Sequence, residues 1–203
     1  GTARKNLETI LSGILGKSVY FSLNLRNSGG SRFKIVERGT NNVIAPTLDS
    51  LSTGQIALFN MFSTIVRYAD NNDLSKSISL SEISGIVIID EIDKHLHIRL
   101  QKEVLPKLFI LFPQIQFIIS SHSPFLHMGL ADTLLNRSQI IDLDNNGINV
   151  SPTNNDLYRE VYEMMINENR RFAKKYEEVE ARLKDFSKPI VITEGKTDIK
   201  HIL

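Results

Sequence analysis

The sequence of 203 residues contains no cysteine. This absence excludes disulfides, thiolate zinc sites and cysteine nucleophiles, and it is typical of proteins from a reducing compartment, so we expect a cytoplasmic protein. No apolar run approaches the roughly 20 residues of a membrane-spanning helix, and no signal peptide is recognisable, so no membrane contact is expected. The net charge is only +1, so overall charge predicts neither a nucleic-acid nor a membrane partner.

A complete phosphate-binding loop of the form G-x-x-x-x-G-K-[ST] is also missing. Its last three residues occur at positions 16–18 and again at positions 195–197. The required first glycine is replaced by Leu11 in one case and by Ile190 in the other. The first copy follows a helical pattern, so we interpret Gly16 as the end of a helix.

The sequence does contain an alternation of strand-like and helix-like segments. Apolar or alternating runs predict strands at 19–25, 32–36, 85–89, 116–119 and 139–143. Apolar residues at helical spacing predict helices at 5–17, 53–69, 97–111 and 124–130, and Pro106 should kink or split the third of them. This order predicts an α/β fold with a mostly parallel sheet flanked by helices.

The composition divides the chain into three parts. We expect one domain at 1–152, a helical linker at 153–187 and the beginning of another unit at 188–203. The linker combines apolar residues at helical spacing with many charges, and its basic residues are flanked by glutamates. Such a neutralised helix is a poor surface for phosphates, so we interpret it as a solvated connector.

Two adjacent carboxylates follow the apolar run GIVII at 85–89. A buried strand of this kind delivers Asp90 and Glu91 to its carboxyl end, where open α/β sheets bind ligands. In nucleoside triphosphatases the first acid holds Mg²⁺ through water and the second is the base for the attacking water. We assign these roles to Asp90 and Glu91, with a solvated strand end as the alternative.

A second buried strand, in QFIISSHS at 116–123, ends in a polar cluster that contains His122. The short crossover between the two runs predicts that their strands are neighbours. His122 would then lie beside Asp90 and Glu91, where it can contact a terminal phosphate or hold the attacking water. The alternative is a histidine in a loop or helix cap.

The stretch LSTGQ at 51–55 predicts the beginning of a helix. Ser52, Thr53 and Gly54 are poor residues for a helix interior but good ones for its start, and the amphipathic pattern begins at Gln55. Gly54 leaves room for a group to approach the backbone. The usual ligand at such an N-terminus is a phosphate.

These segments, in this order, resemble the ATP-binding-cassette (ABC) ATPase superfamily. LSTGQ is similar to the signature motif LSGGQ, with Thr53 in place of a glycine, GIVIIDE to the Walker B strand, and SSHS to the switch-histidine loop. DKHLH at 93–97 occupies the position of the D-loop and departs from the transporter pattern. Its HLH form resembles the non-transporter branch that contains the OLD (overcoming lysogenization defect) nucleases and their AAA-type relatives.

The resemblance implies a homodimer in which two subunits sandwich ATP and Mg²⁺. The signature residues Ser52, Thr53, Gly54 and Gln55 would face the nucleotide of the opposite subunit. Glu91 and His122 would act on the nucleotide of their own subunit. The D-loop residues Asp93, His95 and His97 would lie near the dimer contact or the nucleotide; with no third ligand nearby, a metal role for the two histidines is disfavoured. The Walker A motif belongs to the N-terminal half of such a domain, so we expect this chain to be the C-terminal half and inactive by itself.

The run PIVITEGKTDIKHIL at 189–203 resembles the opening of a Toprim domain. Glu194 ends its strand and Asp198 follows four residues later, an arrangement that suits a further divalent cation for phosphodiester cleavage. In the OLD family a Toprim nuclease follows the ATPase, which implies an ATPase that controls a DNA nuclease in anti-phage defence. Three alternatives stay open: an SMC/RecF-type DNA-maintenance ATPase without a nuclease, a generic strand–turn–helix at this position, or a fragment that binds no nucleotide.

Overall fold

The computed structural model describes residues 1–23, 33–71, 73, 76–134, 137–152 and 155–184. Contacts divide the chain into two units, Gly1–Arg159 and Glu160–Leu203. The first unit contains the helices α1 (Thr2–Leu15), α2 (Thr53–Ala69), α3 (Leu105–Ile110) and α4 (Pro124–Leu134). Shorter helical turns are η1 (Leu48–Ser50), η3 (Leu80–Glu82) and the π-helix η4 (Leu100–Val104).

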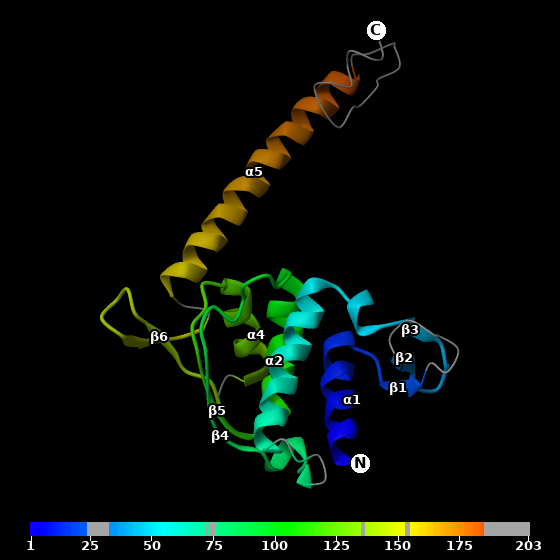
Figure 1. Cartoon of the computed structure of the whole chain (residues 1–203). Helices are drawn as coiled ribbons and strands as arrows, with labels where there is room; N and C mark the ends of the chain where they lie inside the picture. Colours follow the sequence, from blue (N-terminus) through cyan, green and yellow to red (C-terminus); the bar gives the residue numbers. More distant parts are fainter. Residues whose placement is uncertain (24–32, 72, 74–75, 135–136, 153–154, 185–203) are drawn as a thin grey trace. The chain divides into compact units, whose positions relative to one another are not determined.

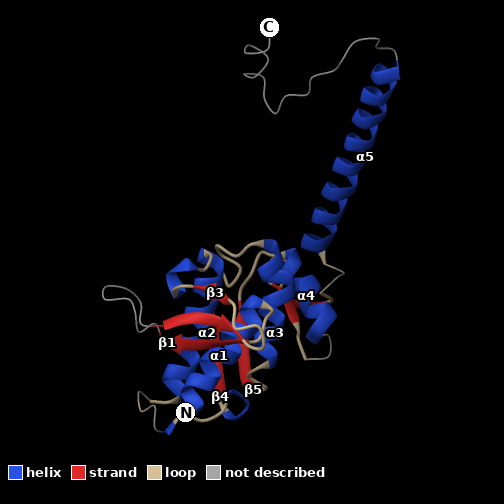
Figure 2. Cartoon of the chain, turned by 90° about the vertical axis from the view of Figure 1, so that its right-hand side faces the viewer, coloured by secondary structure: helices blue, strands red, loops and turns tan. Residues whose placement is uncertain are grey.

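Seven strands form three small sheets in the described residues. The first is antiparallel and contains β1 (Val19–Leu23), β2 (Phe33–Glu37) and β3 (Val43–Ala45). The second is the parallel pair of β4 (Ser84–Ile89) and β5 (Gln114–Ile119), which lie side by side in Figure 2. The third is the antiparallel pair of β6 (Ile140–Asp142) and β7 (Ile148–Val150).

The expectation of a mostly parallel sheet is wrong for the described part of the chain, because only β4 and β5 pair in parallel. One cause lies in the turn after β6, where the Ile148 N–H donates to the Asn145 carbonyl at 3.3 Å. Asn146 (φ 58) and Gly147 (φ 71) both adopt left-handed conformations. This geometry is a type I′ turn, which folds the chain into a hairpin. The strand β7 was not predicted from the sequence.

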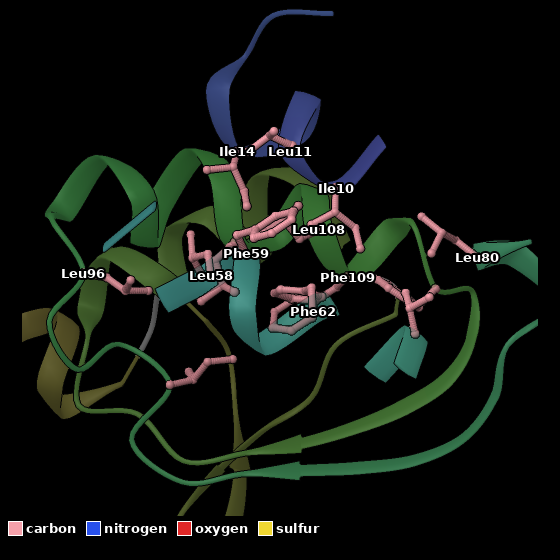
Figure 3. Packing of buried hydrophobic residues seen from close by; sticks show 14 of the residues in the cluster. Ile10, Leu11, Ile14, Leu58, Phe59, Phe62, Leu80, Leu96, Leu108 and Phe109 are labelled. Carbon is pink, nitrogen blue, oxygen red and sulfur yellow. The ribbon is translucent and has the colours of Figure 1, made fainter. Parts of the chain in front are cut away.

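The core lies between the helices and the inner face of the β4–β5 pair (Figure 3). Its completely buried members are Ile10, Leu11, Leu58, Phe62, Leu105 and Leu108. Phe62 of α2 stacks on Phe112 with ring centroids 5.7 Å apart and lies 6.2 Å from the ring of Phe117 in β5. Burial of these large side chains fixes α2 against the inner face of the β4–β5 pair.

Pro106 divides the helical segment that follows residue 97, as predicted. The segment begins at Ile98, passes through the π-helix η4 and continues as α3, with Pro106 in the first turn of α3. Proline has no N–H to donate and its ring crowds the preceding turn. The Leu105 N–H donates to the Leu100 carbonyl, five residues back, which is the hydrogen bond of a π-turn.

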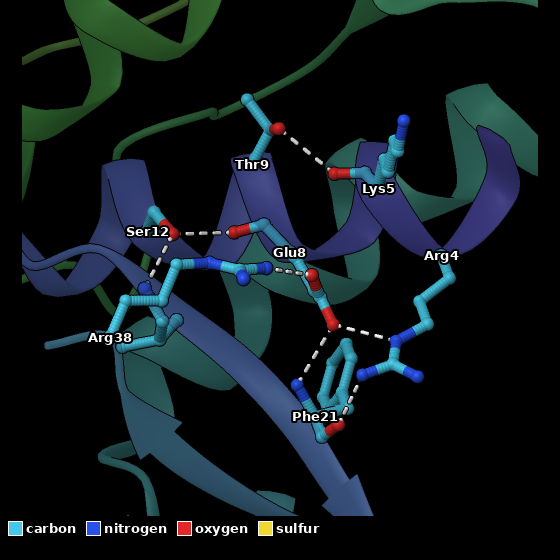
Figure 4. A network of polar contacts seen from close by, with 8 residues as sticks. Arg4, Lys5, Glu8, Thr9, Ser12, Phe21 and Arg38 are labelled. Carbon is cyan, nitrogen blue, oxygen red and sulfur yellow. Dashed lines mark hydrogen bonds and ion pairs between the residues drawn. The ribbon is translucent and has the colours of Figure 1, made fainter. Parts of the chain in front are cut away.

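A buried carboxylate connects α1 to the antiparallel sheet (Figure 4). Glu8 accepts hydrogen bonds from the Arg4 Nε at 2.7 Å and from the Phe21 N–H at 3.0 Å, and it also pairs with Arg38. Its side chain is only 7% exposed, whereas both arginines are more than half exposed. The network therefore ties two elements together through one carboxylate.

The second unit is represented by α5 (Asp156–Lys184), which begins at the end of the first unit. This helix covers most of the segment 153–187, for which the sequence predicted a helix. None of the described helices is long and apolar enough to cross a membrane. Glu194 and Asp198, and with them the Toprim-like strand, lie outside the described residues.

Candidate functional site

The carboxyl ends of β4 and β5 bring Asp90 and Ser120 together. The strands pair in parallel with Ile89 opposite Ile119, so the next residue of each strand lies at the same edge. The Ser120 hydroxyl donates to the Asp90 carboxylate and accepts from the Glu91 N–H at 2.8 Å. The prediction that the two strands are neighbours is confirmed. Ser120 was not singled out in the sequence; its position directly after the second buried strand was the available signal.

Glu91 leaves the strand in a left-handed conformation with a φ of 49°. This conformation is unusual for a residue other than glycine, and it belongs to a tight turn in which the Lys94 N–H donates to the Glu91 carbonyl at 3.0 Å. The Lys94 ammonium lies 2.7 Å from the Glu91 carboxylate, and this hydrogen bond raises the pKa of Lys94. Both side chains are more than half exposed, so the ion pair is weak and readily exchanged for another partner.

His122 lies in the loop that follows β5, two residues after Ser120, and is exposed. The loop is fixed on its far side by Ser123, which is 4% exposed and whose N–H donates to the Ser121 hydroxyl at 3.0 Å. No hydrogen bond or ion pair joins His122 to Asp90 or Glu91 within the described residues. The structure thus brings His122 to the same edge but leaves it without a direct contact to the acidic pair.

The segment 93–97 turns back between β4 and the π-helix. His95, with a φ of 64°, and His97 are exposed, and the His97 Nδ1 accepts from the Arg99 N–H at 3.3 Å. Asp93 is half-buried, and its Oδ1 and the Nδ1 of His127 in α4 are buried without hydrogen-bond partners among the described residues. Burial lowers the pKa of His127, and the Asp93 carboxylate acts in the opposite direction. Asp93 therefore faces the interior, while the two histidines face outward.

LSTGQ forms the beginning of α2, as predicted. The Gln55 N–H donates to the Ser52 hydroxyl at 3.3 Å, and the Ser52 N–H donates to the Gln55 side-chain oxygen at 3.0 Å. This reciprocal pair is a capping box, which satisfies two backbone groups at the helix start. Ser52 and Thr53 remain exposed at the end of a 17-residue helix.

Gly54 has a different environment from the one expected. It is buried, and a Cβ at this position would lie 2.8 Å from a terminal carbon of Leu100 and 3.3 Å from the His95 carbonyl oxygen. The group that approaches its backbone within this chain is therefore the 95–100 segment. The absence of a side chain at this position allows the start of α2 to pack directly against the 95–100 segment.

The oxygen ligands at the carboxyl ends of β4 and β5 suit Mg²⁺, which needs few protein ligands, better than a metal ion that is coordinated by protein side chains alone. Within the described residues no group of three or more histidine, aspartate or glutamate side chains could hold a metal. Mg²⁺ usually takes one or two carboxylates and completes its shell with water and substrate phosphates. Asp90, with the Ser120 hydroxyl beside it, offers this limited set of oxygen ligands.

The class of protein is an AAA-type ATPase, as a comparison with known families shows. Residues 9–129 match the family described as AAA domain, putative AbiEii toxin, Type IV TA system. This match covers more than half of the chain, and the chain belongs to this family.

Curated relatives share parts of the sequence. The Retron Vc95 probable ATPase of Vibrio cholerae serotype O1 biovar El Tor is 39% identical over 107 residues, which are 52% of this chain and 20% of the relative. The Septu protein PtuA of Bacillus mycoides (strain KBAB4) is 49% identical over 51 residues, which are 25% of this chain and 7% of the relative. The Retron Ec83 probable ATPase of Escherichia coli is 38% identical over 84 residues, 41% of this chain and 15% of the relative. The chain thus matches one fifth or less of each relative's length.

Solved structures of SMC proteins are also similar. A chain from work on ATP-driven dimerization and DNA-stimulated activation of SMC ATPases has a TM-score of 0.43 at 20% identity, covering 83% of this chain and 91% of that one. The Smc head domain of Pyrococcus furiosus has a TM-score of 0.40 at 18% identity, covering 83% of this chain and 38% of that one.

Proposed function

We propose that the intact protein hydrolyses ATP with Mg²⁺ and that this chain supplies the hydrolytic edge. The observation that carries the proposal is the Asp90–Ser120–Glu91 cluster at the carboxyl ends of two adjacent parallel strands. Asp90 would hold Mg²⁺ through water, and Glu91 would be the base for the attacking water. His122 would contact the terminal phosphate from the next loop.

To act as the base, Glu91 would exchange its present ion-pair partner, Lys94, for the nucleotide site. In the structure its carboxylate is paired with the Lys94 ammonium at 2.7 Å. Because the pair is exposed, an entering nucleotide with its Mg²⁺ can displace the ammonium at little cost. Lys94 would then be free to pair with a phosphate oxygen.

The N-terminus of α2 supports a homodimer with ATP between its subunits. Ser52 and Thr53 are exposed, and a helix start attracts anions through its unpaired N–H groups. A second copy could therefore present its nucleotide phosphates here. The buried Gly54 would support the site from behind rather than contact the nucleotide, and Gln55 would preserve the cap.

The outer face of the β4–β5 pair supports a further partner, the half of the domain with the Walker A motif. Ile86, Ile88 and Ile118 are 65%, 76% and 48% exposed on this face. Parallel sheets are normally covered on both faces, so these isoleucines require a covering layer. We propose that the Walker A half supplies this layer and the nucleotide-binding loop, and that the fragment alone does not hydrolyse ATP.

For the whole protein we propose control of a DNA nuclease in anti-phage defence. Support comes from the retron and Septu relatives and from the Toprim-like residues Glu194 and Asp198, which would hold a second divalent cation. An SMC/RecF-type ATPase without a nuclease is the alternative. Incubation of the intact protein with DNA, ATP and Mg²⁺ distinguishes them, because only the first cleaves DNA and loses cleavage in Glu194→Gln.

Glu91→Gln tests the ATPase proposal. The variant of the intact protein should lose turnover while still binding ATP, and should accumulate as an ATP-bound dimer in size-exclusion chromatography with light scattering. Glu37→Gln is the matched control, since it removes the 3.3 Å ion pair with Lys17 in the antiparallel sheet, away from the edge. Turnover that is unchanged in Glu91→Gln would refute the assigned role.

A further inference from the structure

Gln101 connects the 93–97 segment to the loop that carries His122. Its side-chain NH₂ group donates to the Leu96 carbonyl at 2.7 Å and to the Asp93 carbonyl at 3.4 Å, and its backbone N–H donates to the His97 carbonyl at 3.1 Å. Its side-chain oxygen accepts from the Ser123 hydroxyl. One half-buried residue therefore contacts three carbonyls of one segment and the buried end of the other.

The orientation of this amide is determined by its partners. The carbonyls of Asp93 and Leu96 can only accept, so the NH₂ group must face them and the oxygen must face Ser123. The Ser123 hydroxyl must then donate its single proton to the Gln101 side-chain oxygen. The same hydroxyl accepts from the Leu126 N–H at 3.2 Å. Leu126 lies in the first turn of α4. The chain of hydrogen bonds therefore runs from the turn at 93–97 into α4, and its donors and acceptors can be arranged in only one way.

The packing around the π-helix makes this connection stiff. Leu100 lies against Gly54 of α2, and a Cβ on Gly129 of α4 would come within 2.1 Å of the Lys102 carbonyl oxygen. Helices α2 and α4 thus pack closely, through Gly54 and Gly129, against the residues on either side of Gln101. Close-packed interiors transmit displacements rather than absorb them.

We propose that Gln101 is a positioning residue that transmits the arrangement of the 93–97 segment to His122. The inference rests on the proposed function, in which the 93–97 segment lies near the second subunit and His122 acts on the nucleotide. Arrival of the second copy would move the Asp93 and Leu96 carbonyls. Gln101 would carry this movement through Ser123 to the switch loop, so that hydrolysis is coupled to dimer closure.

Hydrogen exchange in the intact protein without nucleotide tests the connection directly. Ser123→Ala removes one end of the chain of hydrogen bonds and should make the amides of residues 94–97 exchange about five- to tenfold faster, the factor expected for one lost internal hydrogen bond. In a Gln101→Met background the same Ser123→Ala substitution should add nothing further. Additive effects of the two substitutions would overturn the proposal, because the signal would then travel by another route.

Kinetics separate positioning from general stability. Gln101→Met should lower kcat about tenfold while KM for ATP stays within about twofold, since only the hydrolytic geometry changes. Gln114→Met is the matched control: it removes one side-chain hydrogen bond, to the Ser81 carbonyl at 2.8 Å, at the opposite end of β5, and should leave both constants unchanged. Equal losses in the two variants would overturn the proposal. If the unsubstituted intact protein does not hydrolyse ATP, the proposed function is refuted instead. The hydrogen-exchange experiment would still show whether Gln101 connects the 93–97 segment to Ser123.

Discussion

The Ser120 hydroxyl donates a hydrogen bond to the Asp90 carboxylate across the parallel β4–β5 pair. The same hydroxyl accepts from the Glu91 N–H at 2.8 Å, so it fixes both the proposed magnesium ligand and the backbone of the proposed base. A single serine directly after the neighbouring strand thereby sets the spacing of the acidic pair.

Replacement of this serine should affect turnover more than stability. Ser120→Ala leaves the Asp90 carboxylate free to rotate, and we expect ATP turnover of the intact protein to fall about 10- to 100-fold. The melting temperature should change little, because Ser120 is exposed. Ser138→Ala, which removes a 2.9 Å hydrogen bond to the Leu134 carbonyl, is the control. Full activity of Ser120→Ala would contradict its positioning role.

The buried carboxylate of Glu8 should be important for stability. Glu8→Gln removes the charge that two arginines and the Phe21 N–H contact, and we expect the free energy of unfolding to fall by about 1–3 kcal/mol in urea denaturation. Glu37→Gln, whose carboxylate pairs with Lys17 at the surface, should change it far less. Similar effects of the two substitutions would argue against a special contribution of burial.

Stability should fall with acidification in a way that depends on His127. Burial lowers the pKa of His127 from its usual value of 6.5, so the unfolded chain takes up the proton at a higher pH than the folded chain. The free energy of unfolding therefore decreases as the pH drops through 6.5 toward the lowered value. His127→Gln should flatten this dependence between about pH 7 and pH 5, whereas His97→Gln at the surface should preserve it. Identical pH profiles for the wild type and His127→Gln would contradict the assignment.

Gly129 and Gly13 should differ in their response to an added methyl group. Gly129→Ala places a Cβ 2.1 Å from the Lys102 carbonyl oxygen, a backbone atom that cannot move without α4 or the π-helix moving too. We expect a loss of about 1–3 kcal/mol or more in thermal unfolding. Gly13→Ala meets only the end of the Leu108 side chain, at 3.0 Å, and should be tolerated better. The reverse order would show that the π-helix adjusts freely.

The elements around the edge were largely predictable because local signals determine them. The apolar run before Asp90, the capping residues Ser52 and Gln55, and the break at Pro106 each act through neighbours in the sequence. Ser120 and Gln101 were not predicted, since their importance arises only when residues 29 and 8 positions away come into contact. The packing of Gly54 against Leu100 was not predicted for the same reason, because the two residues are distant in the sequence.

The solvent-facing isoleucines of β4 and β5 have a practical consequence. Apolar side chains exposed together on one face of a sheet favour self-association. Expressed by itself, the chain should collect in inclusion bodies or as soluble multimers, and co-production with a polypeptide that covers Ile86, Ile88 and Ile118 should recover a homogeneous species.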